Sequence, residues 1–271
     1  MHDEYVDEVL AWRRHLDERL RRRDGWLALA GLIWLDDGSF FAGSGPAADI
    51  HLPESAPDRL GTSEVRQGRV SFRPEAPVDG APPAGESLHP DTHDEPHYLR
   101  AGDLTIVVIE RGGRVGLRVW DNARPQRAGF AGRTWYDVDR AWRIEAPFEP
   151  ADGGTIEVPN ILGGVERQPL VGLARFAGHG QAASLRAVPS DDGRPWFLFG
   201  DPTNGETTYP AGRFLVADPP RGGVIVLDFN RAYNPPCAFT PFATCPLPPE
   251  GNRLPFPVLA GERFTPGLNH D

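Results

Sequence analysis

The sequence contains no lysine, and all 28 of its basic residues are arginines. This absence excludes mechanisms that need an ε-amine, such as a Schiff-base lysine or pyridoxal phosphate held as an internal aldimine. It also excludes the standard phosphate-binding loop, which requires a lysine. Any fixed positive charge at a site must come from arginine or protonated histidine, and arginine favours two-pronged recognition of carboxylates and phosphates. We expect no cofactor.

Cysteine is almost as scarce, with only Cys237 and Cys245 in 271 residues. Two cysteines are far too few for the disulfide framework of a small secreted scaffold, which favours a reducing compartment. No apolar run reaches the roughly 18 residues of a membrane span. The N-terminal segment also lacks the apolar region and cleavage site of a signal peptide. We therefore expect a cytoplasmic protein.

Two common enzyme signatures are missing as well. The segment Phe41–Gly45 lacks the Gly-x-Ser-x-Gly elbow of serine hydrolases. No Gly-x-Gly-x-x-Gly fingerprint follows a predicted strand. These absences argue against a serine hydrolase of that class and against a dinucleotide-binding domain.

Positive charge is in deficit, because the formal net charge is -10 and the isoelectric point is near 5.3. Such a surface repels phosphate backbones and anionic lipids. We expect neither nucleic acid nor a membrane as a partner. A small-molecule ligand or substrate is the expected partner, and a homodimer is left open.

What the chain does contain is one helical pattern followed by many short apolar stretches. From Glu4 to about Arg23 the apolar residues recur at helical spacing, and Asp24 with Gly25 provides a stop. Beyond this point 31 glycines and 29 prolines punctuate short stretches rich in Val, Ile, Leu, Phe and Trp, which is typical of many strands. We predict one N-terminal amphipathic helix, residues 1–24, and a single mainly β domain, residues 25–271, folded as a barrel or a two-sheet sandwich.

The strand predictions follow the apolar stretches, and a hairpin turn is expected at Glu110–Arg114. The Pro-rich segment Arg73–Pro96 is predicted to be a long loop. Strands are predicted near Trp26–Leu35, Val65–Phe72, Leu104–Glu110, Val115–Trp120, Trp142–Phe148, Thr155–Pro159, Val171–Phe176, Ala183–Val188, Trp196–Gly200, Arg213–Val216 and Val224–Phe229.

The densest group of polar residues begins at Asp228 and continues, among repeated prolines, to Glu262. It follows the apolar run Val224–Leu227, so its side chains should emerge at the end of a buried strand, where pockets often form. The prolines restrict the backbone and so lower the entropy cost of holding side chains in place. The alternative is structural, because Asn and Asp beside proline are ordinary turn-formers and a buried Arg-Asp pair can serve folding alone.

Four blocks of the sequence resemble the family called domain of unknown function 1684. The blocks are Gly25–Leu35, Gly116–Asp121, Thr207–Leu215 and Asp228–Glu262. The resemblance implies no activity, fold or cofactor. It implies that the polar residues within these blocks matter, for folding or for function: Arg118, Asp121, Tyr209, Arg213, Asp228, Asn230, Arg231, Asn234, Cys237, Cys245, Asn252 and Glu262.

Two weaker patterns suggest other chemistry. His89, His93 and His97 could chelate zinc, but the prolines beside them oppose a helix through all three, and a solvated acidic loop is the favoured interpretation. Cys237 and Cys245 have the wrong spacing for a zinc knuckle, and a nucleophilic thiol would need a base from elsewhere in the fold. We therefore predict no metal site.

The leading hypothesis is an enzyme, possibly a hydrolase, that acts on a small polar or anionic metabolite in a pocket around the C-terminal block. Asp228, Arg231 and Glu262 are the candidate catalytic residues, with the carboxylates as proton acceptors. The candidate substrate-binding residues are Arg118, Asp121, Tyr209, Arg213, Asn230, Asn234 and Asn252. The alternative is a noncatalytic small-molecule-binding or interaction module in which the block is structural. A third hypothesis is a metal-dependent enzyme that uses the histidine loop.

Overall fold

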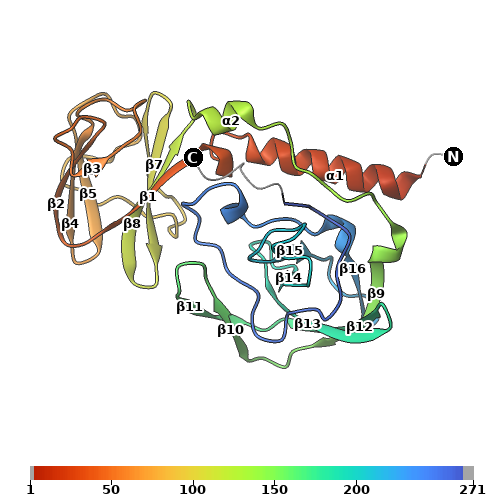
Figure 1. Cartoon of the computed structure of the whole chain (residues 1–271). Helices are drawn as coiled ribbons and strands as arrows, with labels where there is room; N and C mark the ends of the chain where they lie inside the picture. Colours follow the sequence, from red (N-terminus) through yellow and green to blue (C-terminus); the bar gives the residue numbers. More distant parts are fainter. Residues whose placement is uncertain (1–2, 265–271) are drawn as a thin grey trace. The chain divides into compact units, whose positions relative to one another are not determined.

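The computed structural model describes residues 3–264 and shows a mainly β protein with one long N-terminal helix, which confirms the predicted fold class (Figure 1). The chain forms two compact units. Unit 1 comprises Met1–Glu18 and Ala131–Asp271, and unit 2 comprises Arg19–Phe130. The single β domain expected from residue 25 onward stays a prediction. None of the helices within residues 3–264 is long and apolar enough to cross a membrane.

The predicted amphipathic helix is α1 (Glu4–Leu20). Its buried stripe includes Val9 and Leu16 at the spacing expected for one helix face. Arg13 occupies the same stripe, one turn after Val9, and is only 6% exposed. A buried arginine at a core-facing position must find polar partners, and those partners belong to the candidate site described below.

Unit 2 contains two antiparallel four-stranded sheets that share one hydrophobic core. The strand orders are β1-β8-β7-β6 and β3-β2-β4-β5, with β2 and β3 the one parallel pair of the latter sheet. The expected hairpin turn joins β7 to β8 through Gly112 and Gly113, whose φ values of 57° and 74° suit a type I′ turn. The elements of unit 2 are η1 (Trp26–Ala28), β1 (Leu29–Leu35), β2 (Gly38–Gly43), β3 (Ile50–His51), β4 (Gly61–Arg66), β5 (Arg69–Pro74), β6 (Tyr98–Ala101), β7 (Leu104–Arg111), β8 (Arg114–Asp121) and α2 (Pro125–Gly129).

Unit 1 is built on a six-stranded antiparallel sheet with the order β15-β14-β13-β12-β9-β16, and a two-stranded ribbon of β10 and β11. The sheet curls, and two backbone hydrogen bonds between Phe214 of β15 and Tyr233 join one edge to the segment that follows the other edge. The elements of unit 1 are η2 (Arg140–Trp142), β9 (Arg143–Pro150), β10 (Thr155–Pro159), β11 (Val165–Pro169), β12 (Gly172–Gly178), β13 (Gln181–Pro189), β14 (Pro195–Phe199), β15 (Arg213–Val216), β16 (Val224–Asp228), η3 (Phe229–Arg231) and η4 (Pro236–Ala238).

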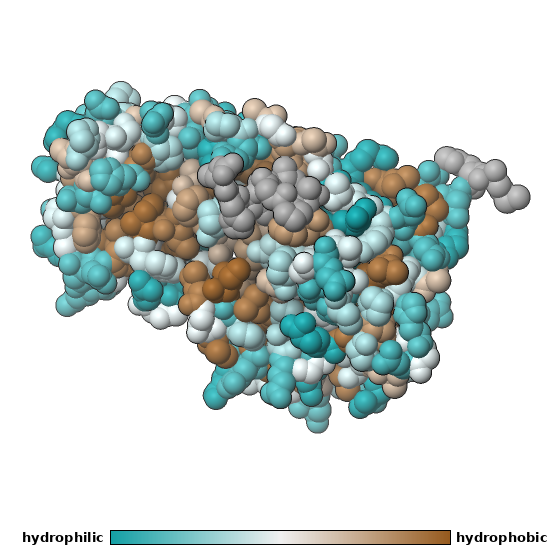
Figure 2. Space-filling view, in the orientation of Figure 1, coloured by the Kyte–Doolittle hydropathy of each residue, from teal (hydrophilic) through white to brown (hydrophobic). Residues whose placement is uncertain are grey.

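The segment after β16 contributes to the core of unit 1 rather than lying over it. Leu254, Phe256 and Val258 are at most 2% exposed and pack with the side chains of the curled sheet. The polar residues of the C-terminal block therefore lie on a segment that is itself anchored in the core. Figure 2 shows mostly hydrophilic surface over β12 and β13, and hydrophobic surface near the β10–β11 ribbon, where Ile161, Leu162 and Val165 are exposed.

Most predicted strands are present, with two kinds of error. The single strand predicted at Val65–Phe72 is wrong, because the chain reverses at Gln67 and Gly68, whose φ values are 52° and 73°. The sequence pattern also missed β2, β3, β6 and β11, which are short or polar. The loop predicted at Arg73–Pro96 is confirmed beyond the end of β5.

Candidate functional site

The predicted site residues lie in both units. Arg118 and Asp121 belong to β8 of unit 2, and the other eight belong to unit 1. Arg118 pairs with Asp91 at 3.6 Å and lies over the rings of Trp26 and Trp120. Asp121 accepts a hydrogen bond from the backbone N–H of Ala123 at 2.9 Å, which fixes the turn after the strand. These contacts hold β8 and its turn in place.

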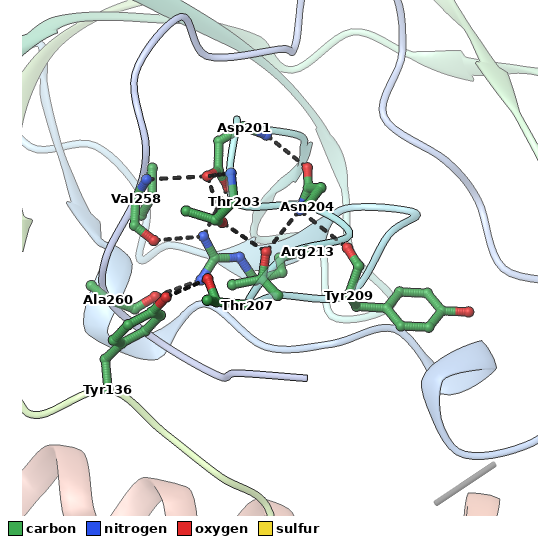
Figure 3. A network of polar contacts seen from close by, with 10 residues as sticks. Tyr136, Asp201, Thr203, Asn204, Thr207, Tyr209, Arg213, Val258 and Ala260 are labelled. Carbon is green, nitrogen blue, oxygen red and sulfur yellow. Dashed lines mark hydrogen bonds and ion pairs between the residues drawn. The ribbon is translucent and has the colours of Figure 1, made fainter. Parts of the chain in front are cut away.

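Arg213 is fully buried and is the centre of a network of polar contacts (Figure 3). Its guanidinium donates to the carboxylate of Asp201 at 2.8 Å and to the carbonyl of Val258 at 2.9 Å, and it also donates to the carbonyl of Ala260. Asp201 in turn accepts from both the N–H and the hydroxyl of Thr203. Together these contacts tie β15 to the loop after β14 and to the C-terminal segment, so the network holds backbone in place.

Asn252 and Tyr209 also make hydrogen bonds to backbone. The amide of Asn252 accepts from the N–H of Arg186 at 2.8 Å and donates to the carbonyls of Arg186 and Leu198 at 2.8 and 2.9 Å. It thereby bridges β13 and β14 where their own pairing has ended. The Tyr209 hydroxyl donates to the carbonyl of Cys237 at 2.9 Å, and burial raises the pKa of this phenol.

Glu262 and Asn234 form a second buried group. The carboxylate of Glu262, 1% exposed, pairs with Arg133 at 2.6 Å and accepts from the backbone N–H of Asn234 at 2.8 Å. Burial raises the pKa of Glu262, although Arg133 opposes that shift. Gly261 lets the backbone before Glu262 lie close to Ala232. Its φ is 80°, and a Cβ there would lie 2.6 Å from the carbonyl oxygen of Ala232.

Asp228 and Asn230 form a third group with Tyr5 of α1. The Tyr5 hydroxyl donates to Oδ1 of Asp228 at 2.8 Å and accepts from the amide of Asn230 at 2.9 Å. Burial and the neighbouring Asp228 raise the pKa of Tyr5 to about 12, so the phenol stays a donor at neutral pH. Oδ1 of Asp228 also accepts from the backbone N–H and the amide of Asn230, both at 3.2 Å. Three donors thus converge on Oδ1, while Oδ2 faces Arg231.

Arg13 connects the second and third groups. It donates to the carbonyls of Tyr136 and Asn230 at 3.0 and 3.1 Å, and its guanidinium lies over the ring of Trp135. Burial lowers the pKa of Arg13, and the charges of Asp228 and Glu262 are among those that oppose this shift. Two of the predicted carboxylates, Asp228 and Glu262, therefore favour the charged form of one buried arginine on α1.

Arg231 differs from the other predicted residues because it is half-buried and loosely held. Its side chain is 33% exposed and lies 3.4 Å from Oδ2 of Asp228 and 3.7 Å from Glu8. Both distances exceed those of a charge-assisted hydrogen bond. Within residues 3–264 its guanidinium makes no hydrogen bond, and its Nε is buried without an acceptor. The N–H donors of the Arg231 guanidinium can therefore bind a ligand.

A second arginine, Arg143, lies on the same face of the sheet as Asp228. Arg143 is the strand partner of Asp228 across the β9–β16 pair, so the two side chains project from the same face of the sheet. Arg143 is exposed, and its guanidinium lies 6.0 Å from the ring of Tyr5 and makes neither a hydrogen bond nor an ion pair within the described part of the chain. We call Tyr5, Arg143, Asp228 and Arg231 the Arg231 site.

Two members of this site were not predicted from the sequence. Tyr5 lies four residues before Val9, on the buried stripe of α1, so a polar ring at a core-facing position was the available signal. No signal in the sequence indicated Arg143, because an exposed arginine at a strand end is common. Asp201 begins a turn closed by the N–H of Asn204, and its carboxylate is also the buried partner of Arg213.

The histidine loop of unit 2 has stacked imidazoles instead of a chelating arrangement. The ring of His89 lies between those of His93 and His97, with centroids 3.9 and 4.3 Å away. The Nδ1 atoms of His93 and His97 accept from backbone N–H groups. Residues 3–264 contain no group of three or more His, Cys, Asp or Glu side chains placed to hold a metal ion.

The protein is therefore mainly β. Its C-terminal block packs into the curled sheet and is bonded to α1 through Tyr5 and Arg13. The chain belongs to the family described as "Protein of unknown function (DUF1684)", whose model matches residues 128–263. This match contains eight of the ten predicted site residues, whereas the resembling blocks before residue 128 lie outside it.

A solved structure is also similar: the solution NMR structure of an uncharacterized protein from gene locus rrnAC0354 of Haloarcula marismortui. It is 31% identical, with a TM-score of 0.45, over 53% of this chain and 83% of that chain. None of the curated proteins matches the chain.

Proposed function

We propose that this chain is an enzyme that acts on a small anionic metabolite bound at the Arg231 site. Arg231 and Arg143 bind the anion, and Asp228 accepts a proton. Because the net charge is -10, available arginines are the feature of this surface that favours an anion. The observation that carries the proposal is the half-buried guanidinium of Arg231, which makes no hydrogen bond within residues 3–264.

The loose ion pairs of Arg231 support exchange with a ligand. A carboxylate or phosphate could take two parallel N–H donors from a guanidinium, whereas Asp228 and Glu8 lie 3.4 and 3.7 Å away. Binding an anion would therefore replace weak contacts by strong ones at little cost. Arg143 would add a second positive charge from the neighbouring strand.

The surroundings of Asp228 support a role as proton acceptor. Its Oδ1 is held by Tyr5 and Asn230, so the orientation of the carboxylate is fixed. Its Oδ2 faces Arg231 alone among these groups, and it becomes available when Arg231 turns to a ligand. A fixed carboxylate with one available oxygen can remove a proton from water or from the substrate, which is the chemistry of a hydrolase.

A second candidate is a noncatalytic binding module in which the rest of the block is structural. It is favoured by the burial of Arg213, Asn252 and Glu262, which are at most 1% exposed and bonded to protein groups. On either proposal these three residues hold the fold, and the two proposals differ only in whether a bound ligand is converted.

A substrate screen distinguishes the two. Wild-type protein is assayed against carboxylic esters, amides and phosphate esters of small acids, beside Arg231→Ala and the control Arg175→Ala, which removes an exposed arginine paired with Glu149. The enzyme proposal expects turnover that Arg231→Ala reduces about 100-fold or more, as loss of a charged contact in the transition state does. Anion binding without turnover favours the module, and equal activity of both variants contradicts a role for Arg231.

A further inference from the structure

The two cysteines lie together in the segment 237–245, which we call the cysteine loop. The backbone N–H of Cys237 donates to Sγ of Cys245 at 3.1 Å. This contact places the sulfur of Cys245 beside the backbone that carries the Cys237 thiol. The structure records both as cysteines that are not joined by a disulfide.

Both thiols are enclosed by the protein. Cys237 is 5% exposed and Cys245 is 3% exposed. The carbonyl of Cys237 accepts from the Tyr209 hydroxyl, and the carbonyl of Cys245 accepts from the backbone N–H of Ile161. Each cysteine is therefore held by its backbone, and only side-chain rotation and small shifts are left for a reaction between the sulfurs.

From this geometry we propose that Cys237 and Cys245 are a reversible modification site, at which hydrogen peroxide converts the two thiols into an intramolecular disulfide. The burial selects the oxidant, since peroxide is about the size of water, whereas a thiol reagent such as oxidised glutathione must bring a whole tripeptide to the sulfur.

The reaction balances without a further reagent. The Cys237 thiol loses its proton and the thiolate attacks one oxygen of peroxide; the O–O bond breaks, the departing hydroxide takes that proton to leave as water, and sulfenic acid forms on Cys237. The Cys245 sulfur then attacks the Cys237 sulfur, the S–O bond breaks, and the hydroxyl leaves with the Cys245 proton as a second water. The hydrogen bond from the Cys245 thiol lowers the pKa of Cys237, and the Tyr209 hydroxyl acts in the same direction. This makes Cys237 the first thiol to react.

Closing the disulfide would fix the cysteine loop at both ends. The loop contains Phe239, whose ring lies 4.7 Å from the guanidinium of Arg133, the partner of Glu262. A cross-link that closes a short loop stabilises a protein mainly by restricting its unfolded chain. Oxidation is expected to raise the melting temperature by about 5 °C.

The test uses full-length reduced protein treated with hydrogen peroxide or with oxidised glutathione, then denatured, alkylated and mapped by mass spectrometry. Peroxide is expected to remove both alkylatable thiols together, link Cys237 to Cys245 within one chain, and raise the melting temperature; dithiothreitol should reverse all three. Oxidised glutathione should leave both thiols intact. Sulfinic acid without a disulfide, or a disulfide between two chains, overturns the proposal.

Two variants test the order of the steps. In Cys245→Ser, Cys237 is expected to gain oxygen, because no second thiol resolves the sulfenic acid. In Cys237→Ser, Cys245 should react more slowly. The reverse order of rates contradicts Cys237 as the attacking thiol. Because the wild-type experiment requires no substitution, it decides the main proposal even if either variant fails to fold.

Discussion

Arg213 and Asp201 form an ion pair of 2.8 Å in which neither side chain is exposed to solvent. The Arg213 guanidinium also donates to the carbonyls of Val258 and Ala260, and Asp201 accepts from the backbone N–H of Val258. Two segments far apart in the sequence are thereby held by one buried pair of charges. Such a pair is costly to break, because each partner leaves the other charged and desolvated.

The first prediction concerns this pair. Asp201→Asn should lower the free energy of unfolding by about 3 to 5 kcal/mol, since the guanidinium of Arg213 stays buried without its carboxylate. Urea denaturation measures the change. Arg175→Ala, which breaks the exposed pair with Glu149, is the control and should have little effect. A loss for Asp201→Asn no larger than that of the control would mean that the network does not hold the fold.

The second prediction concerns Asn252, which bridges β13 and β14. Asn252→Asp keeps the shape and the acceptor but removes the two N–H donors that satisfy the carbonyls of Arg186 and Leu198. We expect a loss of about 2 to 4 kcal/mol in the free energy of unfolding, because buried acceptors are left unpaired beside a buried charge. Gln181→Ala, at the exposed start of β13, serves as the reference. Stability equal to wild type would refute the bridging role.

The third prediction is a pH dependence that comes from Tyr5. Its pKa is raised from 10.0 to about 12, so the folded state favours the protonated phenol. The resulting stability is fully present below pH 10 and is lost as pH rises through about 12. Tyr5→Phe removes the hydrogen bond to Asp228 and should cost about 1.5 kcal/mol at neutral pH.

The measurement for Tyr5 is the difference in unfolding free energy between wild type and Tyr5→Phe. This difference should be constant from neutral pH to pH 10 and should shrink between pH 10 and about 12. Subtracting the two proteins removes the titration of their common groups. A difference that grows over the same interval would show that the phenol is not held as a donor.

Local patterns in the sequence predict the elements of this fold better than they predict its contacts. Short apolar stretches identify β7 and β8, and Gly112 with Gly113 identifies the turn between them. β11 is not predicted because its sequence, VERQP, is largely polar and exposed. The sequence prediction joins β4 and β5 into one strand because the apolar residues before and after Gln67 and Gly68 form one short stretch, and the turn at these two residues is not recognised.

The site could be located in the sequence only in part. The C-terminal block does gather buried polar groups, but their partners are distant in the sequence: Arg13 lies 217 residues from Asn230, and Arg133 lies 129 residues from Glu262. No local pattern encodes such pairs. What distinguishes Arg231 from Arg213 is the degree of burial and the number of bonds made, and these are properties of packing rather than of residue type.

The central claim is that Arg231 is an anion-binding group and not a structural one. The most direct test is the melting temperature of wild type, Arg231→Ala and Arg175→Ala with phosphate or citrate, against chloride at equal ionic strength. A ligand that binds only the folded state raises the melting temperature by mass action. The account predicts similar melting temperatures for all three proteins in chloride, and an increase with the test anion in wild type and Arg175→Ala that Arg231→Ala lacks. An equal increase in Arg231→Ala, or a melting temperature in chloride that falls by several degrees in that variant, would contradict it.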